Sequence, residues 1–467
     1  MSRFIFWALV ALVVVAPLPL AGNRPAPWSA MAIWVGMLLV LWALVAVRRR
    51  PQGARVADRF LLPVLVAFAG AIGWMLLQIA GPLPADWQPP AMARASALLQ
   101  AEPAAGIRLD GGAGWHVVMR LLAYGGVFVL AWEFGRSRAR AQAMLYAAVL
   151  AGIAYAAYGL TVHFGGYDTV LWFPKTAYRD SVTSTFINRN SYATYAALGL
   201  LCALALMFSE WRRLRAAARH PMALAGARPL AGAPRNGGAP GSELRLGLLS
   251  IGAAVLAAAL LLTGSRGGFY GLAATLAIVV ALLALAGLLR GWRLFGVIGL
   301  GALAGAALLL ATGGGLSGRL DRGAANIESS RGALFAPTVE AIRQRPMTGY
   351  GPGSFQGVFE AVNDGTLYRQ GYYIDKAHNT YLELALEAGI PAALAMVAAI
   401  FAIAALCLVA LLRRRAVRFA LAGLGASIMV AIHALVDFSL QMPAVAVTYA
   451  AVLGVCAAQS LRRLTER

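Results

Sequence analysis

Two arginines lie among small and amide residues in a chain that is otherwise strongly apolar. Arg189 lies in the segment 188–190, Asn-Arg-Asn, and Arg266 lies in the segment 264–268, Gly-Ser-Arg-Gly-Gly. Such neighbours let a ligand approach the backbone closely, and a helix that begins there favours an anion at its N-terminus. Because the planar guanidinium group matches phosphate oxygens in pairs, the two arginines together could hold a diphosphate. Arginines that only reach toward lipid headgroups are the alternative.

A histidine in a third polar segment is the candidate base. His378 lies in Asp-Lys-Ala-His-Asn-Thr-Tyr, residues 375–381, and an imidazole can accept the proton of an attacking hydroxyl group. A histidine that makes only structural hydrogen bonds is the alternative. His433 and Asp437 are four residues apart, so on a helix they would share one face. They could orient an imidazole, although we favour a structural tie between two spans.

Residues next to these groups complete the candidate site. The candidates for substrate binding are polar residues of the same segments: Asn188, Asn190, Ser265, Lys376, Asn379 and Tyr381. The candidates for a structural or supporting role are His433, Asp437, Gly351 and Gly353.

The elements that must position these residues are membrane-spanning helices. Of the 467 residues, 60% are hydrophobic and 13% are charged, whereas soluble proteins carry about 25% charged residues. The apolar residues fall into runs of roughly 18–24, which is long enough to cross a hydrocarbon core. We therefore predict an all-α polytopic membrane protein with about 12 transmembrane helices. The predicted spans are 4–22, 28–47, 60–81, 116–134, 142–163, 190–208, 245–263, 267–289, 294–312, 380–412, 419–436 and 440–461.

The net charge of +21 follows a pattern along the chain. The arginine clusters fall in every second gap between apolar runs: Arg48–Arg50, Arg136–Arg140, Arg212–Arg215, Arg290–Arg293, Arg413–Arg415 and Arg462–Arg463. By the positive-inside rule these gaps and both termini are cytoplasmic, and the candidate site is periplasmic. A basic surface for nucleic acid would not alternate in this way, so we expect no nucleic-acid partner. Ionisable residues are nearly absent from the middle of the predicted spans, which argues against a proton-coupled transporter.

The loops divide the chain into regions. Residues 1–163 are the N-terminal transmembrane helices with a periplasmic loop at 82–115, and residues 164–461 form the candidate catalytic membrane region. The largest periplasmic loop is 313–379. Within it Ala333, Leu334, Thr338, Ala341 and Ile342 follow helical periodicity, which predicts a helix over 328–345. The cytoplasmic segment 209–245 is rich in Arg, Ala, Pro and Gly and is predicted to be flexible.

Five motifs together resemble the O-antigen ligase and O-antigen polymerase superfamily of bacterial envelope glycosyltransferases. They are Thr185–Asn190, Gly264–Gly268, Pro346–Phe355, Ala377–Glu383 and His433–Phe438 with Pro443 after it. The resemblance covers roughly residues 180–450. Each motif is weak alone, but all five lie in the expected order at outward ends of predicted spans.

The resemblance implies a twelve-helix fold of the type called GT-C in the bacterial inner membrane, with a large, partly helical periplasmic loop over the active site. It implies a glycan donor on undecaprenyl diphosphate, a glycan acceptor such as lipid A-core, membrane lipid as surroundings, and no metal or cofactor. Arg189 and Arg266 would hold the diphosphate, and His378 would act near the acceptor hydroxyl. The absence of Asp-x-Asp, His-x-x-x-His and cysteine from the outward loops agrees with a metal-independent reaction.

Three functions remain open at this point. The first is an O-antigen ligase that transfers a glycan to lipid A-core or a similar acceptor. The second is an O-antigen or exopolysaccharide polymerase that joins lipid-linked repeat units. The third, from a different class, is a transporter of lipid or polysaccharide, which would need polar residues along a central path.

Overall fold

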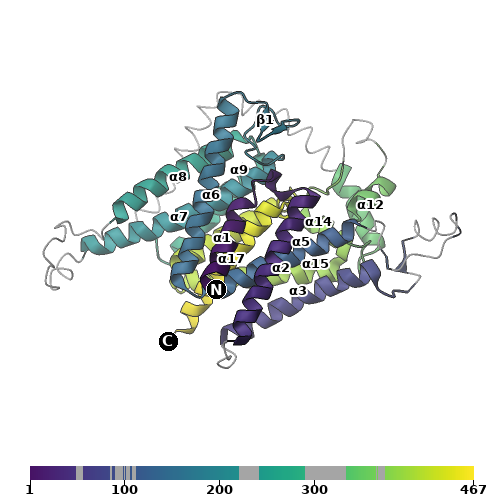
Figure 1. The fold of residues 1–467 in the computed structure, drawn as a ribbon, viewed down its shortest axis with the longest axis horizontal. Helices are drawn as coiled ribbons and strands as arrows, with labels where there is room; N and C mark the ends of the chain where they lie inside the picture. The colour runs from purple at the N-terminus through teal and green to yellow at the C-terminus, as the bar shows by residue number, and fades with distance from the viewer. Residues whose placement is uncertain are drawn as a thin grey trace.

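The computed structural model describes residues 1–48, 56–84, 87–89, 98, 100, 106–107, 112–219, 241–289, 333–363, 365 and 374–466. Long helices form nearly all of this part of the chain, which confirms the predicted all-α class (Figure 1). Its strands are β1 (Thr169–Val170) and β2 (Phe173–Pro174), a two-residue antiparallel pair. The long helices are α1 (Ser2–Val15), α2 (Pro25–Arg48), α3 (Val56–Ala80), α5 (Ala113–Gly135), α6 (Arg138–Phe164), α7 (Arg189–Arg219), α8 (Ser242–Leu262), α9 (Arg266–Leu285), α15 (Ile390–Leu412), α16 (Val417–His433) and α17 (Pro443–Thr465). The short ones are η1 (Leu20–Gly22), α12 (Phe355–Val362), α14 (Thr380–Ala388) and η4 (Ser439–Gln441).

Nine helices in the described ranges are long and apolar enough to cross a membrane: α2, α3, α5, α6, α7, α8, α9, α15 and α17. Helices α1 and α16 are shorter but also apolar. Eleven of the twelve predicted spans therefore coincide with an observed helix. The remaining span, 294–312, lies outside the described residues. The chain is a multi-pass membrane protein built from helices.

The predicted span 380–412 is wrong in one respect, because a glycine divides it. Gly389 has φ +81° and separates α14 from α15. The segment 346–351 crosses the chain at this point, where the amide of Ile390 donates to the Pro346 carbonyl at 2.8 Å. A Cβ atom at position 389 would collide with the Met347 carbonyl oxygen. The break therefore depends on a tertiary contact, and it separates α14, which carries site residues, from the long helix α15.

The cytoplasmic segment predicted at 209–245 is helical at both ends. Helix α7 continues to Arg219 and α8 begins at Ser242, while residues 220–240 lie outside the described part. Glu210 joins the two ends, because its carboxylate accepts from Arg213 at 2.8 Å and from the Ser242 hydroxyl at 3.1 Å. Of the loop predicted at 82–115, residues 85–86, 90–97, 99, 101–105 and 108–111 lie outside the described part, and so do all of residues 313–332. Residues 333–344 form the predicted helix, with Leu334, Thr338, Ala341 and Ile342 buried.

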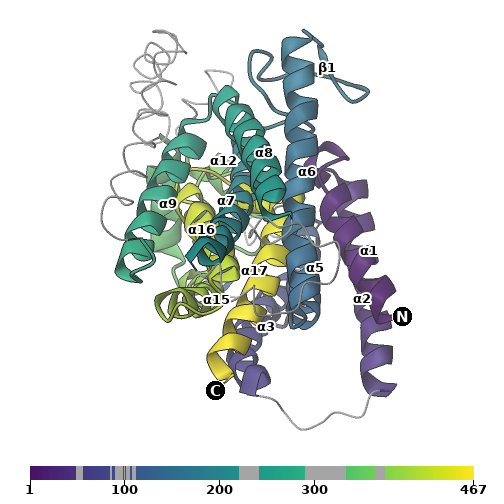
Figure 2. The same ribbon diagram turned by 90° about the vertical axis from the view of Figure 1, so that its left-hand side faces the viewer.

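Two helices form the centre of the bundle. Almost the whole length of α17 is buried, and α7 is buried over most of its apolar length. Glycines allow the closest approach of α17 to α5, because a Cβ atom at Gly135 would lie 2.6 Å from the Val455 Cα and one at Gly454 would lie 2.8 Å from the Phe128 carbonyl oxygen. Figures 1 and 2 show α17 enclosed by the other helices. The central helices thus provide rigid supports for groups at their ends.

Arginines of three of the arginine clusters contact other segments at one end of the bundle. There Arg462 donates to the Arg136 carbonyl at 2.9 Å, Arg140 donates to the Ser2 hydroxyl at 3.2 Å, and the Arg414 guanidinium donates to the Ala286 carbonyl at 2.6 Å. Both chain termini lie toward this end (Figure 2). Helices α7, α9, α14 and α17 begin at the opposite end, which is called the site end below.

Candidate active site

Helix N-termini bring the two candidate arginines to the site end. Arg189 is the first residue of α7, and the Asn188 side chain accepts from the amides of Asn190 at 2.7 Å and Ser191 at 3.4 Å. Arg266 is the first residue of α9, and the Ser265 hydroxyl caps that helix by accepting from the Gly268 amide at 3.1 Å. Both candidate arginines therefore sit at a helix N-terminus, where the helix dipole favours an anion.

The two arginine segments lie against each other. A Cβ atom at Gly264 would lie 3.6 Å from a terminal nitrogen of Arg189, and one at Gly268 would lie 2.6 Å from the Ala193 Cβ. Gly264 itself has φ +63°, a conformation that suits glycine. The turn before α9 is thus packed directly on the first turns of α7, so the structure brings these two segments together.

Both guanidinium groups are half-buried and available to a ligand. Arg189 lies over the Tyr178 ring, with 5.0 Å from the guanidinium carbon to the ring centroid. Within the described part of the chain, neither Arg189 nor Arg266 makes a hydrogen bond or ion pair with another protein group. Their donors therefore remain for an anionic ligand.

His378 lies beside a buried carboxylate at the start of α14. Its Nδ1 atom is 3.9 Å from Oδ2 of Asp437, and its ring packs edge-on against Phe438 with 4.9 Å between centroids. His378 has φ +51°, which is uncommon for a residue other than glycine. The following residue, Asn379, caps α14 by accepting from the amides of Tyr381 at 3.0 Å and Leu382 at 3.1 Å. A constrained backbone and a carboxylate therefore fix the imidazole.

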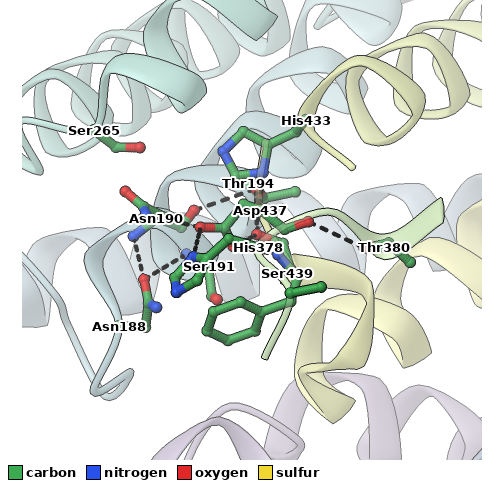
Figure 3. A network of polar contacts seen from close by, with 12 residues as sticks. Asn188, Asn190, Ser191, Thr194, Ser265, His378, Thr380, His433, Asp437 and Ser439 are labelled. Carbon is green, nitrogen blue, oxygen red and sulfur yellow. Dashed lines mark hydrogen bonds and ion pairs between the residues drawn. The ribbon is translucent and has the colours of Figure 1, made fainter. Parts of the chain in front are cut away.

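Asp437 is the centre of the polar network in Figure 3. Its side chain is buried, and it accepts from the Asn190 amide group at 2.8 Å, from the Phe438 amide at 2.8 Å and from the Ser439 hydroxyl at 3.0 Å. Because Asn190 follows Arg189 and His378 faces the same carboxylate, one group connects the candidate arginine segment with the candidate base (Figure 3).

His433 and Asp437 are connected differently from the sequence prediction. Helix α16 ends at His433, so the two residues do not share a helix face. Instead Ser439 joins them, because its hydroxyl lies 3.1 Å from Nδ1 of His433 and donates to Asp437. The Thr194 hydroxyl on α7 also contacts Nδ1 of His433, at 3.0 Å. A Cβ atom at Gly267 would lie 3.1 Å from Nε2 of His433. His433 thus joins α7, α9 and α16, in agreement with a structural tie.

The remaining predicted residues support the same end of the bundle. The Tyr381 hydroxyl donates to the Ala431 carbonyl at 3.0 Å, and Lys376 lies 3.5 Å from the Glu383 carboxylate. Gly351 and Gly353 have φ +93° and +77°, and the Gly351 amide donates to the Glu387 carbonyl at 2.9 Å. The glycine turn therefore closes the last turn of α14, while Tyr381 anchors that helix to α16.

A polar cavity of about 980 Å³ opens beside this network. Its wall includes Asn188, Gly353 and Lys376 among the predicted residues. Arg189, Arg266 and His378 do not form the wall themselves. Tyr178 and Phe438 do, and these are the rings against which Arg189 and His378 pack. The cavity therefore lies next to Arg189 and His378.

Residues 251–397 match the family described as O-antigen ligase. The chain carries an O-antigen ligase domain. A comparison with curated proteins returned no match. The O-antigen ligase domain contains Arg266, Lys376 and His378, whereas Arg189 and Asp437 lie outside the matched range. The site is thus assembled from the domain together with α7 and the connection between α16 and α17.

Three ionisable residues that the sequence prediction did not single out lie near the polar cavity. Arg120 lies inside the predicted span 116–134, and Glu383 and Glu387 lie inside the predicted span 380–412. Arg120 and Glu387 line the cavity with Lys376. A charged residue inside a predicted span was the available signal, because such residues are costly there and usually functional.

Burial and neighbouring charges shift the pKa values of Glu387 and Lys376 in this group. Burial, and then the nearby Glu383 carboxylate, raise the pKa of Glu387 to about 7, although Lys376 and the amides of Gly353 and Phe355 act in the opposite direction. Burial alone would lower the pKa of Lys376, but the neighbouring carboxylates raise it above its ordinary value. Glu387 therefore exchanges a proton near neutral pH, and Lys376 stays charged.

Proposed function

We propose that this protein is a metal-independent glycosyltransferase of the O-antigen ligase type, with a GT-C architecture. It would move a glycan from undecaprenyl diphosphate to an acceptor hydroxyl group, such as one on lipid A-core, at the periplasmic face of the bacterial inner membrane. One observation carries this proposal. Two arginines that make no hydrogen bond or ion pair within the described chain lie at adjoining helix N-termini, and a single buried carboxylate connects that region with His378.

The arginines suit the departure of a lipid diphosphate. The acceptor oxygen forms a bond with the anomeric carbon, and the bond from that carbon to the diphosphate oxygen breaks, leaving its electron pair on the diphosphate. The diphosphate is already a weak base and needs no proton. Stabilisation of its growing negative charge by fixed donors lowers the barrier, and the loss of one such donor costs about 2.7–4 kcal/mol in other enzymes. Arg189 and Arg266 would supply those donors.

His378 suits the acceptor side of the reaction. The acceptor hydroxyl must lose its proton as it attacks, and a neutral imidazole can take it. The Asp437 carboxylate would hold the ring in place and stabilise the imidazolium that forms, in the way a buried aspartate supports a catalytic histidine elsewhere. Asn190 would keep the carboxylate fixed by donating to Oδ2 at 2.8 Å.

The test is transfer by the purified protein in vesicles. The protein would be given a glycan on undecaprenyl diphosphate, alone or together with lipid A-core. A product on lipid A-core identifies a ligase, and a ladder of products on the lipid carrier identifies a polymerase. Folded protein that yields neither product with any acceptor would overturn the glycosyltransferase proposal. Flux of intact lipid-linked glycan across the vesicle under those conditions would then identify a transporter.

A further inference from the structure

A second, apolar cavity of about 290 Å³ lies between helices α3, α5, α14, α15, α16 and α17. Its walls are almost entirely hydrocarbon and include Phe68 of α3, Leu121 of α5, Val397 and Ile403 of α15, and Leu453 of α17. We call it the apolar groove. A groove of this composition between membrane helices suits an alkyl or prenyl chain and offers nothing to bind a sugar.

The apolar groove and the polar cavity share part of their walls. Val117, Arg120, Lys376 and Glu387 line both. The polar cavity extends from these residues to Asn188 and Tyr178, which lie beside Arg189. A molecule with its chain in the apolar groove would therefore place its polar end in the same cavity that the candidate donor arginines adjoin.

The shared wall carries two cations, Arg120 and Lys376. Arg120 is seven residues from the start of α5, which is about 10 Å along the helix. Its guanidinium group donates to the carbonyls of His116 at 3.3 Å and Gln441 at 3.5 Å and lies over the Trp28 ring at 4.8 Å. In the described chain it makes no ion pair with a carboxylate. A charge inside a membrane helix normally has a partner or marks a ligand path.

Lys376 and Glu387 complete this wall. Lys376 lies 3.5 Å from Glu383, and its side chain is 25% exposed, so one face remains open to the cavity. Glu387 is buried, and its carboxyl accepts from the Phe355 amide at 3.3 Å. With a pKa of about 7, Glu387 can be neutral beside an anion. Arg120 and Lys376 together thus offer two cations to an anionic headgroup, and the adjacent carboxyl need not repel it.

We propose that the apolar groove and the Arg120–Lys376 wall bind the lipid part of the acceptor substrate. Its hydrocarbon chain would lie between α3, α5, α15 and α17, and its phosphate would contact Arg120 and Lys376. Its hydroxyl-bearing sugar would extend through the polar cavity toward His378. This inference rests on the proposed glycosyltransferase function and adds to it that the acceptor is held by its lipid part, at a place separate from the Arg189 and Arg266 region.

The test compares two tryptophan substitutions on α15. Val397→Trp would fill the apolar groove, whereas Ala398→Trp places the same side chain on the exposed side of the same helix, away from the groove walls. Transfer would be measured in vesicles with a glycan on undecaprenyl diphosphate as donor and lipid A-core as acceptor. Val397→Trp and Arg120→Gln should each raise the KM for lipid A-core about 10- to 100-fold, the factor expected for a charged hydrogen bond or a filled binding site, with little change in the KM for the donor. Ala398→Trp should match the wild type.

A soluble acceptor provides a second measurement. Lipid A-core stripped of its acyl chains should be a poor acceptor for the wild type. Val397→Trp should use it no worse than the wild type does, because no chain needs to enter the groove, whereas Arg120→Gln should still be impaired because the phosphate remains. Dodecyl phosphate should compete with intact lipid A-core, whereas dodecanol should not, and Arg120→Gln should abolish that difference.

The outcomes separate this inference from the proposed function. A wild type that transfers no glycan to any acceptor, including the lipid carrier, contradicts the proposed function itself. A wild type that transfers glycan normally while Val397→Trp and Arg120→Gln leave the acceptor KM unchanged overturns the inference alone and assigns the groove to a bulk phospholipid. A rise in the donor KM in these variants would also overturn it, because the groove would then hold the donor chain.

Discussion

His378 and Asp437 face each other at the site end, with 3.9 Å between the imidazole Nδ1 and the carboxylate Oδ2. His378 comes from the start of α14 and Asp437 from the connection between α16 and η4, so the contact joins segments 59 residues apart (437 − 378). Asn190 at the start of α7 donates to the same Oδ2 atom at 2.8 Å. Three separate segments therefore meet at one buried carboxylate.

Removal of the base or of its carboxylate should slow the chemical step. His378→Ala is expected to lower kcat about 10²- to 10⁴-fold, the usual contribution of a general base. Asp437→Asn keeps the size of the side chain and should lower kcat while leaving the donor KM nearly unchanged, because it affects the imidazole and not the diphosphate. Steady-state transfer with varied donor measures both constants. A large rise in donor KM with unchanged kcat would contradict these roles.

The two arginines should be needed for the departure of the diphosphate. Arg189→Ala and Arg266→Ala are each expected to lower kcat about 10²- to 10³-fold, as the loss of an oxyanion donor does elsewhere. Arg266→Lys should also be impaired, because an ammonium group cannot replace the planar fork. Arg413→Ala at the opposite end of α15 is the matched control and should transfer glycan normally. Full activity of the Arg266→Lys protein would remove the argument for paired hydrogen bonds.

The break before α15 should be sensitive to a single methyl group. Gly389→Ala is expected to destabilise the protein by about 1–2 kcal/mol or more, because φ is +81° and the added Cβ collides with the Met347 carbonyl oxygen. Gly73→Ala is the control, since a Cβ atom there has no neighbour within 4 Å. Thermal unfolding in detergent would compare the two variants. Equal melting temperatures would show that the break tolerates an ordinary residue.

Glu387 should make the stability of the protein depend on pH. Its pKa is raised from 4.5 to about 7 in the folded protein, so folding favours the protonated form. The resulting stabilisation is complete below about pH 4.5 and is lost as pH rises toward 7. Glu387→Gln removes the titrating group and should flatten the dependence of Tm on pH over this window. An unchanged slope in the variant would mean that another group titrates there.

The sidedness of the bundle can be measured in cells. A reporter that is active only in the periplasm should be active when fused after Gly353 and silent when fused after Arg215. The reason is that arginine clusters are retained on the cytoplasmic side. The reverse pattern would invert the orientation and place the polar cavity in the cytoplasm.

The helices could be predicted from sequence because their signals are local. Apolar runs and the arginine clusters between them located eleven helices and the end at which Arg189, Arg266 and His378 lie. The break at Gly389 could not be found in this way, because it depends on a carbonyl contact from residue 347, distant in sequence. In the sequence, the apolar run continues through position 389.

The connections within the candidate site could not be predicted from the sequence. Arg189 and Asp437 are far apart in the chain, and only the folded structure shows that Asn190 joins their segments. The contact between His433 and Asp437 passes through Ser439, because α16 ends before a helix face can form. A search for charged residues at the middle of each predicted span does not find Arg120, because this residue lies near the start of α5.

The distribution of the site over the chain limits how the protein can be divided. The O-antigen ligase domain at 251–397 supplies Arg266 and His378, but Arg189, Asn190 and Asp437 are outside it. A chimera that exchanged only this region with a relative would therefore pair a foreign histidine with the resident aspartate. We expect that functional hybrids need a crossover before α7 and another after η4, so that the unit inherited together runs well beyond the domain on both sides.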